Sequence, residues 1–148
     1  MNRQREIREF FCNFIKCGVA GWCMEIIFTS MESIAAKDMR LMGRTSLLMF
    51  PIYGMGAMLG PISGWMDRWI GEPHALTQKD IFWRHGFSDM VLIFCAEYVT
   101  GAFLKARNMC PWDYSGRIWN VDGLIRLDFA PFWFAAGLIF ERLTRTKN

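Results

Sequence analysis

Two glutamates are the side chains in this sequence best suited to chemistry, because each lies inside an apolar stretch. Glu25 and Glu97 come near the C-terminal ends of such stretches, where an ionised carboxylate is costly without a partner or a task. Two carboxylates in one site repel each other as anions, so such a site favours binding a proton or a cation. The bland alternative is a structural pair, satisfied by Tyr53, Asn120 or Arg126 inside the fold.

Four apolar stretches must position these acids, and they cover residues 10–31, 45–66, 87–104 and 121–143. Residues 45–66 contain no Asp, Glu, Lys, Arg or His, and a helix of that length crosses a hydrocarbon core of about 30 Å. The pattern predicts an all-α, polytopic membrane helix bundle with about four transmembrane helices. We expect a single integral membrane domain over residues 1–148. The alternative is a soluble, aromatic-rich helical domain with buried ion pairs.

The composition excludes several classes of function. The 17 basic residues are scattered along the connections, so the chain lacks the basic stripe of a nucleic-acid-binding protein. The five cysteines include no C-x-x-C pair, which argues against a zinc ribbon or a disulfide framework. His74 and His85 fall in the expected middle connection without i, i+4 spacing, so we predict solvated side chains and no zinc site. No cofactor is expected.

The expected helix directions bring the acids together. The first and third helices run the same way across the membrane, and Glu25 and Glu97 then lie about 9–10 Å below one surface at 1.5 Å per residue. The second helix starts from that surface and brings Tyr53 to a similar depth, while the fourth brings Arg126. The sequence therefore predicts one pocket that contains two carboxylates, a phenol and a guanidinium.

Charge distribution gives an orientation. Nine basic residues fall on the side of the two termini and seven on the other side, or five if Arg44 and Arg126 belong to the pocket. Because cytoplasmic connections carry the excess of Lys and Arg, cytoplasmic termini are favoured. The expected location is the bacterial cytoplasmic membrane.

The second stretch predicts close packing and a break in the helix. Gly56, Gly60 and Gly64 follow one another at four-residue spacing, which lets helix backbones approach closely in lipid. Pro51 and Pro61 each lack an amide donor, so we expect the helix to be kinked or locally unwound. No Walker motif follows the glycines, which excludes nucleotide binding by this chain.

Five motifs, in order, resemble those of the ABC-transporter type IV membrane protein family. They are Gly21-Trp22 with Glu25; Pro51-Ile52-Tyr53-Gly54; Glu97 with Thr100-Gly101; Cys110-Pro111-Trp112-Asp113-Tyr114-Ser115; and Asn120 with Gly123. The resemblance covers residues 10–143 and extends to the vertebrate transmembrane protein 229 group. Bacterial members usually carry an Asn-Arg-Gly triplet where this chain reads Gly43-Arg44-Thr45.

The resemblance implies a multi-pass membrane protein and, through the family's name, a permease. Such a permease needs a separate ATPase subunit. The motif-bearing segment between the third and fourth helices is expected to anchor Trp112 and Tyr114 at the membrane interface, or to shape a pocket. The predicted pocket residues are Glu25, Tyr53, Glu97, Asp113, Tyr114, Asn120, Arg126 and Arg44. The predicted packing residues are Gly21, Trp22, Pro51, Gly54, Gly56, Gly60, Gly64, Gly101 and Trp112.

Three functions remain open at this point. The favoured one is a small transport or ligand-binding component in contact with membrane lipids, assembled as a homo-oligomer or with another membrane protein. The second is an intramembrane enzyme acting on lipid, with Glu25 or Glu97 as general base, Arg126 holding a phosphate and Asp113 orienting the substrate. No nucleophile or metal signature accompanies that possibility, so no catalytic residue is assigned. The third is a structural or assembly factor for another membrane protein.

Overall fold

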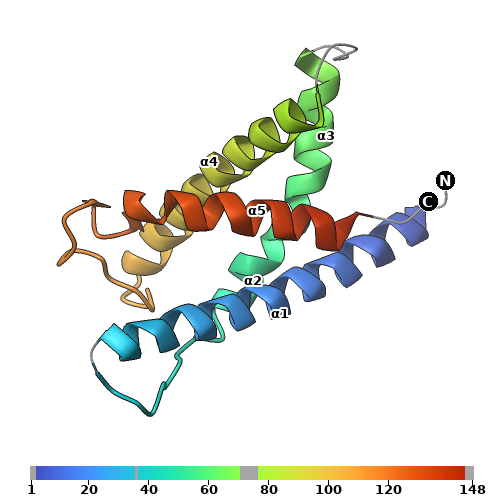
Figure 1. Ribbon diagram of the computed structural model, residues 1–148. Coiled ribbons are helices and arrows are strands. Elements are labelled where there is room, and N and C mark those ends of the chain that lie inside the picture. The colour runs from blue at the N-terminus through green and yellow to red at the C-terminus, as the bar shows by residue number, and fades with distance from the viewer. Residues whose placement is uncertain (1–2, 36, 71–76, 146–148) are drawn as a thin grey trace. The chain divides into compact units, whose positions relative to one another are not determined.

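The protein is mostly helical, in two units. The computed structural model describes residues 3–35, 37–70 and 77–145. The chain divides into two compact units, Met1–Gly56 and Ala57–Asn148. Figure 1 shows α1 and α2 of the first unit, and α3, α4 and α5 of the second. The predicted all-α class is confirmed, apart from one short hairpin.

The first unit is a helical hairpin held together by aromatic rings on glycines. It consists of α1 (Arg3–Ala35), a connection and the short α2 (Met49–Gly54). A Cβ atom at Gly18 would overlap the ring of Phe50, and one at Gly21 would overlap the ring of Tyr53. The two helices therefore approach closely because both positions on α1 lack a side chain.

The second predicted span is broken, as the prolines indicate. After α2 comes the 3₁₀ turn η1 (Met55–Met58), and then α3 (Leu59–Ile70). Pro61 lies in the first turn of α3 and has no N–H to donate to the carbonyl of Ala57, so an unbroken α-helical ladder cannot pass this point. Pro51 occupies the equivalent place in the first turn of α2. Residues 45–48 precede the helical part of this stretch.

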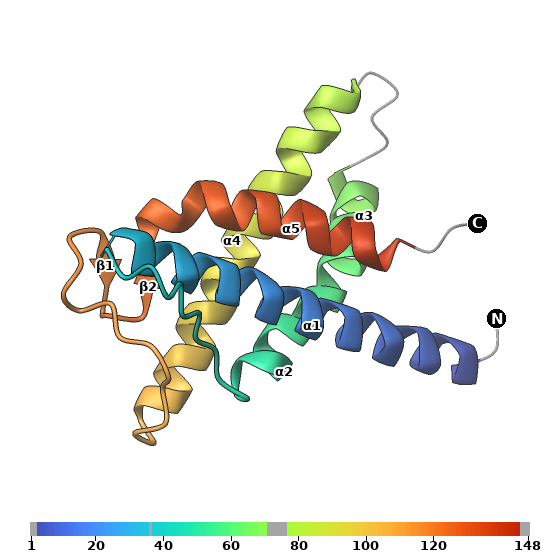
Figure 2. The same cartoon turned by 60° about the horizontal axis from the view of Figure 1, so that its bottom comes forward.

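The second unit is built from α3, α4 (Gln78–Lys105) and α5 (Ala130–Thr144), which pack against one another. In Figures 1 and 2, α5 lies across α4. Two glycines allow the close approach. A Cβ atom at Gly86 of α4 would overlap the ring of Phe134, and one at Gly137 of α5 would overlap the Cβ of Asp89.

Capping fixes both ends of α4. At its start Thr77 and Asp80 form a capping box, in which the Thr77 N–H donates to the Asp80 carboxylate (2.8 Å). At its end Asn108 adopts a positive φ of 56°, and the Met109 N–H donates to the Leu104 carbonyl (2.9 Å), a Schellman-type termination. With its N-cap at Thr77, α4 starts well before residue 87, the predicted start of the third apolar stretch.

The predicted fourth span, residues 121–143, is wrong over its first nine residues, 121–129, because α5 begins only at Ala130. These residues lie in the hairpin of β1 (Asn120–Val121) and β2 (Ile125–Arg126), followed by the 3₁₀ turn η2 (Leu127–Phe129). Figure 2 shows the two strands in the connection between α4 and α5. Asp122 and Gly123 both have positive φ, 55° and 71°, which is the backbone of a tight hairpin turn. Arg126 is consequently a strand residue and not a helix residue.

Two helices have the length and composition to cross a membrane. Among the described residues these are Arg3–Ile34, within α1, and Gln78–Lys105, which is α4. The 15 residues of α5 span about 22 Å, less than a hydrocarbon core of about 30 Å. The count of four transmembrane helices stays a prediction.

Both long helices expose apolar side chains along their whole length. On α4 many of them follow a four-residue spacing: Trp83, Phe87, Val91, Val99 and Phe103. On α1 the exposed set is Ile7, Phe10, Phe11, Ile15, Val19, Ile26, Ile27, Met31 and Ile34. Exposed apolar area costs about 25 cal/mol per Å² in water, and this cost disappears in hydrocarbon.

Two glycine substitutions test the packing of α4 on α5. In Gly137→Ala the new methyl group meets the Cβ of Asp89, so the helices must separate, and we expect a loss of about 1–3 kcal/mol of stability. Gly64→Ala is the matched control, because a Cβ there meets nothing within 4 Å among the described residues. It should be neutral or stabilising by up to about 1 kcal/mol. Thermal unfolding in lipid discs, followed by circular dichroism, measures both; equal effects would contradict the packing described.

Candidate functional site

In the first unit, Glu25 of α1 accepts two hydroxyl hydrogen bonds from the returning chain. Thr45 donates its Oγ1 hydrogen to Glu25 Oε2 at 2.5 Å, and the Tyr53 hydroxyl donates to the same carboxylate. Glu25 is half-buried. Two of the predicted pocket residues, Glu25 and Tyr53, are thus in contact, and Thr45 joins them.

A ladder of polar contacts explains why Thr45 reaches Glu25. Trp22, Glu25, Thr29 and Ser33 recur at three- and four-residue spacing, so they form one stripe along α1. The chain runs back along this stripe, with bonds from Trp22 Nε1 to Ser46 O (3.0 Å), Thr29 Oγ1 to Arg44 O (3.2 Å) and Ser33 Oγ to Met42 O (3.2 Å). The connection is therefore held in register by side chains of α1.

Arg44 contributes its backbone to this ladder. Its N–H donates to Thr29 Oγ1 at 2.7 Å and its carbonyl accepts from the same hydroxyl, while the residue as a whole is exposed. Next to it Gly43 lies against α1, because a Cβ there would press on the Ile26 carbonyl oxygen. Gly43 is thus a packing residue that the sequence motifs did not identify.

In the second unit, Glu97 of α4 is buried beneath the connection that carries the other predicted residues. Only 8% of Glu97 is exposed, and the polar side chains that face its carboxyl group are Trp133 of α5 and Tyr114. Glu97 Oε2 and Trp133 Nε1 have no hydrogen-bond partner at normal distance among the described residues. The ring of Phe129 lies near both aromatic side chains, with its centroid 5.8 Å from the centroid of Tyr114 and 6.4 Å from that of Trp133.

Trp112 holds this connection on α4. Its Nε1 donates to the carbonyl of Leu124 at 2.9 Å. Its ring lies against Gly101, one turn after Glu97, where a Cβ atom would come within 3.0 Å of the ring. The predicted packing roles of Gly101 and Trp112 therefore have a physical basis, because any larger residue at 101 would displace the indole.

A second set of bonds ties the hairpin to the same helix. Tyr98 donates its hydroxyl to the Asp122 carboxylate (2.7 Å), and Lys105 donates to the Asp122 carbonyl (2.8 Å). Both donors belong to the last two turns of α4. The turn at Asp122 is therefore anchored beside the buried Glu97.

Asp113 and Asn120 organise the connection internally. Asp113 Oδ1 accepts from the Ser115 hydroxyl (2.6 Å) and from its N–H (3.0 Å), and these bonds lower the pKa of Asp113. Asn120 Oδ1 accepts from the Gly123 N–H at 2.9 Å, and the Tyr114 N–H donates to the Gly123 carbonyl at 2.9 Å. Both predicted pocket residues thus shape the connection that presents Tyr114 to Glu97.

Arg126 makes an ion pair within the connection. Its Nη2 lies 2.6 Å from Asp128 Oδ2, and this bond lowers the pKa of Asp128. The guanidinium carbon also lies 4.1 Å from the centre of the Phe129 ring, a cation–π contact. The side chain is 13% exposed. Arg126 therefore supports the aromatic wall beside Tyr114.

Glu25 and Glu97 belong to different units. Each carboxylate has its own set of partners, Tyr53 and Thr45 for the first, Tyr114 and Trp133 for the second. The single pocket that would join them stays a prediction.

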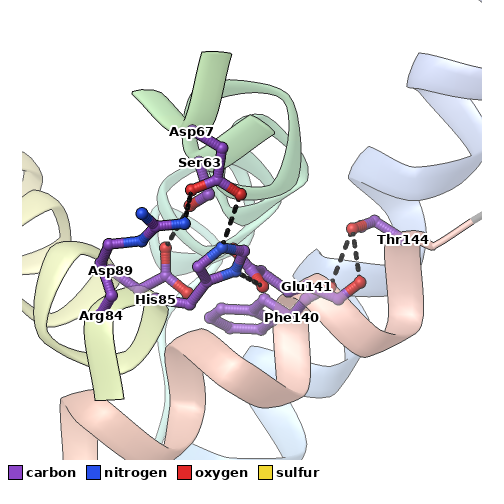
Figure 3. A network of polar contacts seen from close by, with 8 residues as sticks. All are labelled: Ser63, Asp67, Arg84, His85, Asp89, Phe140, Glu141 and Thr144. Carbon is purple, nitrogen blue, oxygen red and sulfur yellow. Dashed lines mark hydrogen bonds and ion pairs between the residues drawn. The ribbon is translucent and has the colours of Figure 1, made fainter. Parts of the chain in front are cut away.

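A third polar cluster, in the second unit, was missed by the motif analysis. Figure 3 shows Asp67 of α3, Arg84, His85 and Asp89 of α4, and Glu141 of α5 around one point. His85 was predicted to be solvated in a connection, and this is wrong: it lies within α4 and bonds carboxylates through both ring nitrogens. His74 lies outside the described residues. The sequence contained one indication of this cluster: Asp89 is an acid in an apolar stretch, one helical turn after His85.

Comparison with known protein families gives one match. The model of the family described as "Putative ABC-transporter type IV" matches residues 12–146, nearly the whole chain. A comparison with solved structures finds no match.

A glycine pair tests the order of the connection over Glu97. Gly123→Ala forces a side chain into a left-handed backbone (φ 71°) and onto Ser115 Oγ, at a cost of about 1–3 kcal/mol. Faster trypsin cleavage after Arg117 is the expected result. Gly116→Ala is the control, since a Cβ there meets nothing within 4 Å among the described residues. If both variants are cleaved like the unmodified protein, the connection is not held by Gly123.

A titration at acidic pH tests the turn that Asp113 forms with Ser115. Because the folded pKa of Asp113 is lowered by its bonds to Ser115, the turn is stabilised fully above the unfolded pKa of about 3.9 and loses this stability as pH falls through the folded value. The Ser115 amide resonance in ¹⁵N NMR should therefore titrate with a midpoint below about 3.9. The titration should disappear in Asp113→Asn, and a midpoint at or above the unfolded value would contradict the turn.

Proposed function

Because the chain belongs to the ABC-transporter type IV family, we propose that it is a small membrane component that transports or binds a ligand through an acidic and aromatic pocket. The family model covers residues 12–146, which confirms the resemblance carried by the sequence motifs. The permease activity and the pocket are parts of this proposal.

The membrane setting is supported by the two long helices. α1 and α4 expose apolar side chains along their length, and both have the composition of membrane spans. In this setting the excess of basic residues beside the termini favours cytoplasmic termini.

The buried carboxylate of Glu97 is the observation that carries the proposal. An ionised carboxylate removed from water costs several kcal/mol unless it is paired. Among the residues that the structure describes, Glu97 Oε2 has no hydrogen-bond partner at normal distance, while Tyr114 and Trp133 frame the group. A ligand that offers a positive charge or an N–H group would satisfy this oxygen, and the aromatic walls would favour an organic cation.

The pocket is closed by a segment that the family motifs define. Trp112, Asp113, Tyr114, Asn120 and Gly123 all take part in the connection that covers Glu97. A segment over a buried acid could admit or retain a ligand when it opens. This explains why the motifs cluster in a connection and not only in helices.

ATP hydrolysis would have to come from a second protein. The sequence contains no Walker motif, so an ABC-type function requires a separate ATPase subunit. We propose this subunit as a partner, together with further copies of this chain, because so few helices enclose little volume by themselves.

Ligand retention tests the proposal. Protein extracted directly into lipid discs and examined by native mass spectrometry should carry a small-molecule adduct, which Glu97→Gln loses because an amide cannot neutralise a cation. Glu6→Gln, an exposed acid on α1, is the matched control and should keep the adduct. The same preparation should contain an ATPase subunit.

Two outcomes would contradict this proposal, and a third would favour a different function. The absence of an adduct from the unmodified protein, or its equal retention in both variants, would exclude a ligand site at Glu97. An adduct with the mass of a membrane lipid that is consumed over time would favour the lipid-acting enzyme instead.

A further inference from the structure

The cluster of Figure 3 is a continuous chain of hydrogen-bonding groups from a half-exposed residue to a buried one. Arg84 Nη2 pairs with Asp67 Oδ1, and Asp67 Oδ2 lies 3.0 Å from His85 Nε2. His85 Nδ1 in turn lies 2.8 Å from Glu141 Oε2. The exposed fraction of the side chains falls along this path from 32% at Asp67 to 14% at His85 and 10% at Glu141.

The path ends at Asp89, which is fully buried. Its Oδ1 accepts from Ser63 Oγ at 3.1 Å, and its other oxygen lies against the backbone of α5 at Gly137. The carboxyl group of Glu141 is a charged neighbour of the carboxyl group of Asp89. Asp89 Oδ2 and Glu141 Oε1 are both buried and have no hydrogen-bond partner among the described residues.

Two buried, neighbouring carboxyl groups favour one shared proton. Two ionised carboxylates are both acceptors, so they cannot bond to each other, whereas one proton between them forms an O–H···O bond. The charges agree. The groups that face one another are Asp67 from α3, Arg84, His85 and Asp89 from α4, and Glu141 from α5, so at most two positive charges meet three carboxyl groups.

We propose that Asp89 and Glu141 hold one exchangeable proton between them, and that His85 and Asp67 carry this proton to and from the surroundings. A proton suits the site better than a metal ion, because no group of three His, Cys, Asp or Glu side chains within residues 3–35, 37–70 and 77–145 is arranged to hold one. The inference does not rest on the proposed function.

The transfer balances at each atom. A proton taken up from water by Asp67 passes to His85 Nε2, and the proton on Nδ1 passes to Glu141 Oε2. Asp67 is again a carboxylate, the imidazole is neutral with its hydrogen on Nε2, and Glu141 carries the new proton on Oε2. Rotation of the Glu141 carboxyl group then turns this O–H from His85 Nδ1 to Asp89, and the two carboxyl groups share the proton. The reverse sequence releases it, and His85 regains its first tautomer.

Infrared spectroscopy of the protein in lipid discs tests the shared proton. At neutral pH the carbonyl stretch of a protonated carboxyl group should be present and should shift in D₂O. Asp89→Asn and Glu141→Gln should each abolish the same band, because the amide NH₂ supplies the hydrogen that the proton supplied. Glu6→Gln should keep it. Because Glu97 can contribute a separate band, only a band lost in both variants counts.

Two results would overturn the shared proton. One is the absence of any band that either variant removes; the other is two different bands, one lost in each variant. If Asp89→Asn does not fold, as judged by circular dichroism and gel filtration, Glu141→Gln decides alone by losing or keeping the band.

The rate at which the shared proton returns after a pH jump tests the role of His85. After a pH jump, recovery of the shared-proton band should slow by roughly a hundredfold in His85→Gln, the lower range of what a positioned acid–base group contributes. The equilibrium band should remain, since Asp89 and Glu141 are intact. An unchanged rate would overturn the relay while leaving the shared proton standing, and neither readout depends on ligand retention at Glu97.

Discussion

The need to satisfy buried carboxyl groups governs the second unit. Asp89, Glu97 and Glu141 are each at least about nine-tenths buried, in helices whose other surfaces are strongly apolar. A buried acid without a partner costs far more than a typical packing contact contributes. The helices therefore pack where these acids find hydroxyl or imidazole groups. Ser63 and His85 serve Asp89 and Glu141, and the connection between α4 and α5 folds back to bring Tyr114 to Glu97.

Glycine makes this arrangement possible, and its positions show which surfaces touch. At Gly86 and Gly137, α4 and α5 approach so closely that a methyl group would overlap a neighbour, whereas a Cβ at Gly64 of α3 meets nothing within 4 Å in the described part of the chain. A small residue in a helix therefore marks an interface only where a bulky or polar partner lies opposite. In the first unit the same principle holds for Gly18 and Gly21, which receive aromatic rings of α2.

Sequence reasoning predicts the features that depend on neighbours in the chain. The long helices follow from the apolar stretches at residues 10–31 and 87–104, and the break near Pro61 follows from one missing N–H. The hairpin could have been found, because Asp122-Gly123 is a strong turn signal. The bonding partners of His85 could not be predicted, because they lie 18 and 56 positions away, although Asp89 marked the same stretch of α4. The groups that face Glu97 likewise come from distant segments, Tyr114 from the connection and Trp133 from α5, although the motifs identified Tyr114 itself.

The two polar sites of the second unit share a common frame. Glu97 faces Trp133 and Asp89 faces Glu141, so the early part of α5 meets the late part of α4 and the reverse. Eight residues separate the two sites on each helix, a rise of about 12 Å. That distance is too long for direct contact, but a shift of α5 along α4 would disturb both pairs at once. Gly137 lies between the two sites and touches Asp89, so the tight packing there resists such a shift. Any coupling between protonation at Asp89 and events at Glu97 would therefore pass through the movement of one helix.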